Sequence, residues 1–212
     1  NGKPNILKAF QEYPKIIRES WQVWSKIPRS GYYLFVTTVI INSLVSACYI
    51  YFVIYATDIR KITGEQYGIA MALSFVGIVL PALLAGFRMD LTGRKRFLVL
   101  GYLLYIPAML LFVVADFYLL IIAFFLFFLG NMLRVNSSQV LLGDLTPRAL
   151  RGKAVGFLQF FLYLTQAFVY LLGGFLYAYI NPQLPFILLA VSTIPLSLIV
   201  IFKIAEPKVK EI

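Results

Sequence analysis

The sequence predicts an all-α membrane protein built as a six transmembrane helix bundle. Of its 212 residues, 61% are hydrophobic and only 13% are charged, whereas soluble domains usually have about 45–50% apolar and about 25% charged residues. Six stretches are apolar over the roughly twenty residues that a helix needs to cross a bilayer. Basic residues flank these stretches mostly on alternate connections. A soluble fold is excluded because its surface must remain largely polar.

The first three predicted spans cover residues 32–56, 67–87 and 97–115. The charged sequence TDIRK follows the first span, and the basic sequence RMDLTGRKR separates the second span from the third. Charged residues are costly inside hydrocarbon. These polar sequences therefore mark the connections between the spans.

The other three predicted spans cover residues 117–143, 152–180 and 184–204. Asp116 marks the start of the fourth span, and the polar sequence DLTPRALR lies between the fourth and the fifth. The short polar sequence NPQ divides the fifth span from the sixth. All six spans are too long, and too polar at their flanks, to be a signal peptide.

The distribution of basic residues predicts the orientation of the bundle. Six lysines and arginines precede the first span, four follow the second, three follow the fourth and three lie at the carboxy-terminal end. The opposite side holds only Arg60 and Lys61. Cytoplasmic connections retain lysine and arginine, so we expect a multi-pass protein of the plasma membrane with both termini cytoplasmic. This retention, together with attraction to anionic lipid heads, explains the net charge of +10 without nucleic-acid binding.

Enzymatic chemistry has little support in the composition. The chain has no histidine, which excludes Ser-His and Cys-His catalysis and histidine-ligated metal sites. Its single cysteine, Cys48, excludes an internal disulfide. We therefore expect no enzyme activity, no cofactor and no metal site.

Residues 1–31 differ from the rest of the chain. Aromatic and aliphatic residues recur there at intervals of three and four, which places them on one face of a helix, with lysines and arginines away from that face. We expect a basic amphipathic cytoplasmic or interfacial linker, helical except where Pro14 interrupts it. A disordered linker is the alternative. Residues 205–212 form the expected cytoplasmic tail.

Two connections carry family motifs. The second-to-third connection contains Gly86-x-x-x-Asp90-x-x-Gly93-Arg94-Lys95-Arg96, which resembles the signature loop of the major facilitator superfamily of secondary transporters. The fourth-to-fifth connection contains Asp144-x-x-Pro147-x-x-x-Arg151-Gly152, which is similar to the corresponding loop of that family. Members have two six-helix halves. The resemblance implies the carboxy-terminal half of such a transporter, with residues 1–31 as the linker between halves.

The charged connections are predicted to act as a conformational latch. Glycines allow sharp turns and close approach of helix ends, and Asp90 near the start of the fifth span would meet unpaired N–H groups and the positive end of a helix dipole. Nearby arginines are its expected ion partners. A basic connection that only sets topology is the alternative. The latch candidates are Gly86, Asp90, Gly93, Arg94, Asp144, Arg148 and Arg151.

Polar residues inside the spans predict a solute cavity. In the fifth span Gln159, Tyr163, Gln166 and Tyr170 fall on one narrow face; a cavity wall and interhelical hydrogen bonding both explain such a stripe. Arg134 is the only charge well inside a span, and either snorkels or binds an anionic group. The third and sixth spans are expected to lie away from this face. The remaining cavity candidates are Asn42 and Asn131.

These observations predict half of a secondary transporter that moves a small solute by alternating access. The absence of a Glu-containing sugar-type motif before the fourth-to-fifth connection favours the exporter or general branch over the sugar porters. The expected partners are the solute, the lipid bilayer, and the other six-helix half or a second copy of this chain. The alternative is a self-contained six-span protein acting as a homodimeric transporter or a membrane scaffold.

Overall fold

The computed structural model describes residues 27–206, and within this range the chain forms six long helices and no strand. The all-α, six-span prediction is confirmed, because each helix is long and apolar enough to cross a membrane. The part of the expected linker before residue 27, and the tail from residue 207, lie outside the described residues. The helices are α2 (Arg29–Ile54), α3 (Gly64–Thr92), α4 (Arg94–Val113), α5 (Phe117–Leu145), α6 (Arg151–Phe175) and α7 (Leu184–Lys203).

Three short helical segments join the long ones. A π-helical segment, Tyr55–Ile59, continues α2, and a second, Leu176–Ile180, continues α6. A 3-10 turn, Arg148–Leu150, precedes α6. The first and fifth spans therefore extend further than their α-helices alone.

Polar side chains cap the starts of α3 and α5. At the start of α3, the Gln66 N–H donates to Thr63 Oγ1 (3.2 Å) and the Thr63 N–H donates to Gln66 Oε1 (3.1 Å), which is a capping box. At the start of α5, Asp116 accepts from the Leu119 N–H (2.9 Å). A hydropathy pattern marks only the apolar part of a helix, so the capped turn of α3 lies before the predicted range, which begins at residue 67, whereas α5 begins at Phe117 as predicted.

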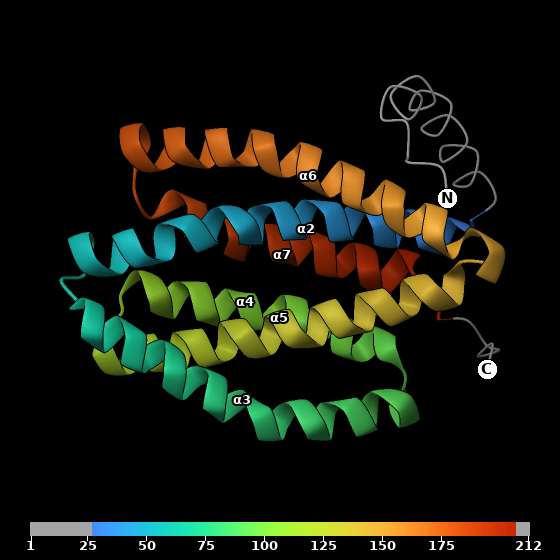
Figure 1. The fold of residues 1–212 in the computed structure, drawn as a ribbon, viewed down its shortest axis with the longest axis horizontal. Coiled ribbons are helices and arrows are strands. Elements are labelled where there is room, and N and C mark those ends of the chain that lie inside the picture. The colour runs from blue at the N-terminus through green and yellow to red at the C-terminus, as the bar shows by residue number, and fades with distance from the viewer. Residues whose placement is uncertain (1–26, 207–212) are drawn as a thin grey trace, which may run out of the picture.

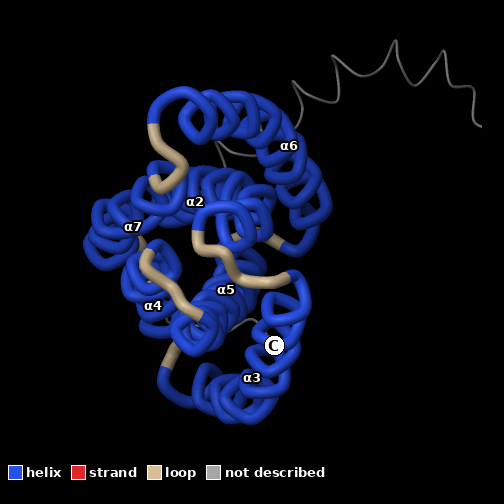
Figure 2. Tube along the Cα trace, turned by 90° about the vertical axis from the view of Figure 1, so that its left-hand side faces the viewer, coloured by secondary structure: helices blue, strands red, loops and turns tan. Residues whose placement is uncertain are grey.

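The helices pack in the spatial order α6, α2, α7, α4, α5, α3, with α4 against α5 as the most extensive contact. Figure 1 shows α6 and α3 at opposite margins of the bundle, with the other four helices between them. Viewed along the bundle, α4 and α7 lie together on one side, whereas α6 and α3 lie at the two extremes of the other side (Figure 2). The third and sixth spans are thus grouped on one side of the bundle.

An aromatic cluster fills the centre where α2, α4, α5 and α7 meet. The ring centroids of Phe52 and Phe112 are 4.9 Å apart, and those of Phe112 and Phe186 are 4.8 Å apart. Phe127 of α5 lies edge-on to Phe52 at 5.0 Å. All four rings are at most 1% exposed. Their large buried area holds these four helices together.

The backbones of α4 and α5 touch at a pair of glycines. A Cβ atom added at Gly101 would lie 2.7 Å from the Gly130 carbonyl oxygen and 2.8 Å from the Arg134 nitrogen. A Cβ atom at Gly130 would lie 2.9 Å from the Gly101 carbonyl oxygen. Small residues permit such close crossings of membrane helices. This crossing places Arg134 directly against α4.

The two described ends of the chain lie at the same end of the bundle. The Ser30 hydroxyl contacts the Lys203 carbonyl oxygen at 3.5 Å and accepts from the Ala205 N–H at 3.1 Å. The α3–α4 connection and the α5–α6 connection lie at this end too (Figure 1). We call it the basic end, because it holds Arg94, Lys95, Arg96, Arg148, Arg151 and Lys153.

Candidate functional site

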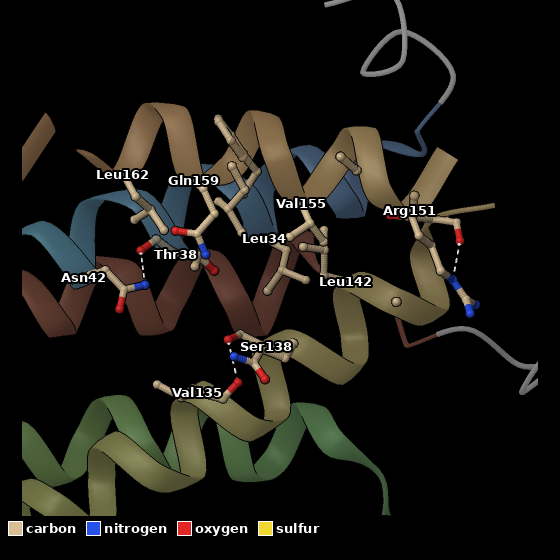
Figure 3. Close-up of a pocket in the computed structure, with 16 residues that line it drawn as sticks. Leu34, Thr38, Asn42, Val135, Ser138, Leu142, Arg151, Val155, Gln159 and Leu162 are labelled. Atoms are coloured by element: carbon tan, nitrogen blue, oxygen red, sulfur yellow. Dashed lines mark hydrogen bonds between the residues drawn. The ribbon is translucent and has the colours of Figure 1, made fainter. Parts of the chain in front are cut away.

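A cavity of about 420 Å³ opens between α2, α5 and α6. Neither α4 nor α7 contributes a residue to its wall. In Figure 3, Asn42 lies towards one end of the lining and Arg151 at the other. The cavity therefore runs from the middle of the bundle towards the basic end. It is lined by Leu34, Phe35, Thr38, Asn42, Val135, Ser138, Gln139, Leu142, Gly143, Thr146, Arg151, Ala154, Val155, Leu158, Gln159 and Leu162.

As formed by the described residues 27–206, the wall is mostly apolar, with a few polar groups and no carboxylate. Arg151 is its charged residue, and the Arg151 Nε–H donates to the Thr146 carbonyl oxygen at 3.2 Å. Pockets that bind small molecules typically combine apolar walls with a small number of placed polar groups. The composition of this wall fits that description.

Asn42 joins the cavity wall to a buried polar cluster behind it. Its side-chain amide donates to the Thr38 carbonyl oxygen (2.8 Å), which fixes the orientation of the side chain on α2. Its Oδ1 atom accepts from Arg134 Nη2 at 3.0 Å. Arg134 is therefore in contact with a lining residue although it does not line the cavity itself.

Arg134 lies at the centre of this cluster and is only 1% exposed. Its Nε–H donates to the Tyr105 hydroxyl (3.1 Å), and its Nη2 atom also donates to Asn131 Oδ1 (2.9 Å). The Tyr105 hydroxyl in turn donates to Asn131 Oδ1 (3.0 Å). Nη1 has no hydrogen-bond partner among the described residues. Snorkelling, one of the two alternatives for Arg134, is not observed.

The polar stripe of α6 is divided between two environments. Gln159 lines the cavity, whereas Gln166 donates to Ser46 Oγ of α2 at 2.9 Å. Tyr163 is 69% exposed and Tyr170 is 37% exposed, and neither belongs to the cavity wall. Of the candidates on this stripe, the structure brings only Gln159 to the cavity, together with Asn42 of α2.

An ion pair joins α4 to α5 at the basic end. Arg94, the first residue of α4, pairs through Nη1 with Asp144 Oδ2 near the end of α5. The two side chains are only 15% and 16% exposed. Arg94 and Asp144, both latch candidates, therefore meet directly, and they connect the two motif-bearing connections.

The α3–α4 connection is also tied to the end of α7. Gly93 has a φ of 95°, which an L-residue rarely adopts, and a Cβ atom there would lie 2.6 Å from the Glu206 carboxylate. That carboxylate accepts from the Arg94 N–H, and Lys95 Nζ donates to the Ile201 carbonyl oxygen at 2.7 Å. The turn at Gly93 thus brings the start of α4 against α7.

The remaining latch candidates have other outcomes. The side chain of Asp90 lies outside the part of the chain that the structure describes. The close helix approach expected at Gly86 is not found, because no described atom lies within 4 Å of a Cβ atom built there. Gly86 lies on the widely exposed helix α3, which explains the open space. Arg148 begins the 3-10 turn, and Arg151 reaches the cavity.

Three residues of these sites were missed in the sequence. Tyr105 is a hydrogen-bond partner of Arg134, Gln139 lines the cavity, and Glu206 caps the turn before α4. Gly101 lies one helical turn before Tyr105, so the glycine was the available signal that another helix approaches this face. Within residues 27–206, no group of three or more histidines, cysteines or acids is arranged to hold a metal ion.

The comparisons with known proteins agree with this architecture. A family model described as Major Facilitator Superfamily matches residues 35–212, which include all of the cavity-lining residues except Leu34. The comparison with curated proteins finds no match.

Proposed function

The chain belongs to the Major Facilitator Superfamily, and from this premise we propose that its six-helix bundle is one half of a secondary transporter that moves a small solute by alternating access. Membership identifies the chain as a multi-pass membrane protein of a transporter family. The remaining points of the proposal are the solute site, the partner bundle, the latch and the orientation.

The cavity between α2, α5 and α6 is the observation on which the proposal depends. Most of its polar groups come from the first, fourth and fifth spans, and one of its walls is α6, of whose apolar stretch only 17% is buried. We propose that Asn42 and Gln159 contact the solute. Tyr163 and Tyr170 are exposed on the same stripe of α6. They would then line the solute path where this bundle faces its partner.

A second six-helix bundle is the proposed partner. Only 22% of the apolar stretch of α3 and 17% of that of α6 are buried, compared with 39–50% for the other four helices. Transporters of this kind bind their substrates between two bundles. The partner is either the amino-terminal half of the same polypeptide or a second copy of this chain.

The Arg94–Asp144 pair is the proposed conformational latch. It lies at the basic end, where α4 and α5 meet the connections that carry the family motifs. An ion pair that forms in one state and opens in the other would bias the bundle towards the state in which it is intact. Gly93 and Arg151 belong to the same end and would move with it.

We propose that the basic end faces the cytoplasm in the plasma membrane. Sixteen of the chain's 19 lysines and arginines flank the spans on the side that this end represents, and cytoplasmic connections retain such residues. The Asp144 motif without a neighbouring Ser favours the exporter or general branch over the sugar porters.

Alternating access can be tested without knowing the solute. In Gln159→Cys, a membrane-impermeant thiol reagent should label the cavity from both sides of sealed vesicles of known sidedness, because each state opens the cavity to one side. Asn181→Cys, in the exposed turn before α7 at the opposite end, is the control and should react from one side only. The unsubstituted chain reports background labelling of the buried Cys48.

Labelling of Gln159→Cys from one side alone, under every condition, would refute alternating access at this cavity. Gln166→Leu provides the matched comparison for Gln159→Leu on the same helix. Loss of the Gln166–Ser46 hydrogen bond should lower thermal stability, whereas Gln159→Leu should reduce solute flux in proteoliposomes and leave stability unchanged. The opposite assignment would place the solute site further along α6.

A further inference from the structure

We propose that the solute is an amphipathic organic anion, and that Arg134 supplies the positive charge that selects it. This inference rests on the proposed transport function and assigns the chemical class of the solute. It is carried by the charges and hydrogen bonds around Arg134, by the composition of the cavity wall, and by the position of Asn42 between them.

The charge of Arg134 is not compensated by any of its hydrogen-bond partners. A guanidinium stays protonated in proteins, and this one is 1% exposed in the middle of a membrane-spanning helix. Its acceptors are a tyrosine hydroxyl and two amide oxygens, all neutral. Buried charges in proteins are normally paired, because an unpaired one loses its solvation without a Coulombic return.

The guanidinium also has unused donor capacity. Nη1 is buried and has no acceptor among the described residues, and an unsatisfied buried donor is energetically costly. An anionic oxygen would satisfy a donor of this kind and neutralise the charge at the same time. Hydrogen bonds between ionised groups are about twice as strong as neutral ones.

The cavity wall supports the same sign of charge. Among the residues that the structure describes, none of those lining the cavity is a carboxylate, and the acid nearest to it along α5, Asp144, is paired with Arg94. The charge of Arg134, which Asn42 contacts from the wall, makes the potential positive at this end of the cavity, and a low-dielectric cleft concentrates such a field. Leucines and a phenylalanine line much of the remainder, which suits a solute with an apolar body.

Asn42 connects the charge to the solute space. Its Oδ1 atom accepts a hydrogen bond from Nη2 of Arg134, and the residue itself forms part of the wall (Figure 3). A carboxylate or sulfonate oxygen that replaced this amide oxygen would exchange a hydrogen bond from the guanidinium to a neutral oxygen for one between two ionised groups. A neutral or cationic solute gains nothing from the exchange, so the arrangement discriminates by charge.

The electrostatic part of the proposal can be measured with two thiol reagents of opposite charge. In Gln159→Cys of the full chain, we compare labelling rates for sulfonatoethyl and trimethylammonioethyl methanethiosulfonate. The anion-to-cation rate ratio should be about tenfold higher than at Asn181→Cys. A nearby positive charge in a partly dehydrated site raises the rate of the anionic reagent and lowers that of the cationic one. Arg134→Gln should remove this preference, and Arg134→Lys should keep it.

A second variant keeps the test decisive where Arg134→Gln fails to fold. Asn42→Asp preserves the shape of the side chain and gives Arg134 a carboxylate at the same position, so the thermal midpoint should be unchanged or higher. The rate ratio at Gln159→Cys should nevertheless fall to that of Asn181→Cys. A ratio unchanged by Asn42→Asp and by Arg134→Gln would overturn the proposal and leave Arg134 a structural residue.

Solute chemistry is tested with 4-phenylbutyrate and 4-phenylbutyramide, which share an apolar body. The acid should protect Gln159→Cys from a neutral methanethiosulfonate, and the amide should not; equal protection by both, or by neither, counts against an anion site.

These outcomes are separable from those of the proposed function. An anionic preference with one-sided labelling refutes alternating access alone, whereas two-sided labelling without a charge preference refutes the anion site alone.

Discussion

Arg94 and Arg134 belong to the adjacent helices α4 and α5, but only Arg94 has a negatively charged partner among the described residues. Arg94 lies at the basic end and forms an ion pair with Asp144 of α5. Arg134 lies inside the bundle and donates only to neutral oxygens of Asn42, Tyr105 and Asn131. Both arginines connect α4 with α5, Arg94 through the carboxylate of Asp144 and Arg134 through the hydroxyl of Tyr105.

The two arginines therefore differ in role: Arg94 joins two helices through an ion pair, whereas Arg134 is available to attract an anion. A paired guanidinium such as that of Arg94 already has its counter-ion, and its contribution depends on whether the pair is closed or open. An arginine held by neutral groups keeps its net charge and attracts an anion from outside. Substitutions around the two arginines test this difference. Their effects on stability can be followed by thiol labelling of Cys48, the chain's single cysteine, which is buried until the protein unfolds.

Gly101→Ala should have the largest effect, because it separates α4 from α5 at the point where Arg134 is held. The new Cβ atom would meet backbone atoms of Gly130 and Arg134 at 2.7–2.8 Å, and backbone cannot move aside as a side chain can. We expect a loss of about 3 kcal/mol in the free energy of unfolding, measured as a lower midpoint of Cys48 labelling. Gly86→Ala, where a Cβ atom meets nothing within 4 Å, is the matched control and should be neutral.

Tyr105→Phe should have the next largest effect, because it removes a neutral acceptor from Arg134. The Nε–H would lose its partner and Asn131 would lose a donor, at a cost of about 2 kcal/mol. The control is Tyr102→Phe on the same helix, since the Tyr102 hydroxyl is buried without a hydrogen-bond partner among the described residues. A drop as large for Tyr102→Phe would show that the loss of a buried hydroxyl in itself, and not the loss of its hydrogen bond with Arg134, determines the result.

Gly93→Ala tests how the turn positions Arg94. A φ of 95° strains an L-residue, and the methyl group would press on the Glu206 carboxylate. We expect a loss of about 1 kcal/mol in stability. Gly152→Ala, in the first turn of α6 with open space around it, is the control and should be neutral or slightly stabilising. An equal response of the two variants would mean that the turn adapts without strain.

Asp144→Asn should have the smallest effect on stability and a measurable effect on conformation. Asparagine keeps the shape of the side chain and an oxygen that can accept from Arg94, so we expect a loss of less than about 1 kcal/mol and an unfolding midpoint that barely changes. Under the latch proposal, the fraction of Gln159→Cys labelled from each side of the membrane should shift. An unchanged distribution between the two sides would remove the Arg94–Asp144 pair from the conformational mechanism.

The sequence predicted the helices more fully than the contacts between them. Apolar length located each span, because hydrocarbon leaves the backbone no alternative to a helix. The ends of the helices were predicted unevenly: Asp116 marked the start of α5, whereas Thr63 caps a turn of α3 that lies before the apolar run. The two π-helical segments have no counterpart in a hydropathy pattern.

The candidate site shows the same division. The sequence singled out Arg134 and Asn42 by their polarity, and the structure brings them into contact. It did not predict Tyr105 as a partner, because a tyrosine in an apolar span resembles any lipid-facing aromatic residue until the glycine crossing is known. Likewise Gln159 and Gln166 share one face of α6, and only the packing of α2 assigns one to the cavity and the other to Ser46.

The hydrogen-bond partners of Arg134 have a consequence for biogenesis. Asn42, Tyr105 and Asn131 all precede Arg134 in the chain, so the ribosome has made every group that solvates the guanidinium before the arginine itself emerges. An arginine at the centre of an inserting helix costs about 2.5–3.5 kcal/mol or more. Here α5 can enter the bilayer next to an α4 that already offers a hydroxyl, and neither α6 nor α7 supplies any of these hydrogen bonds. Insertion of the charged helix therefore does not have to wait for synthesis of the last two spans.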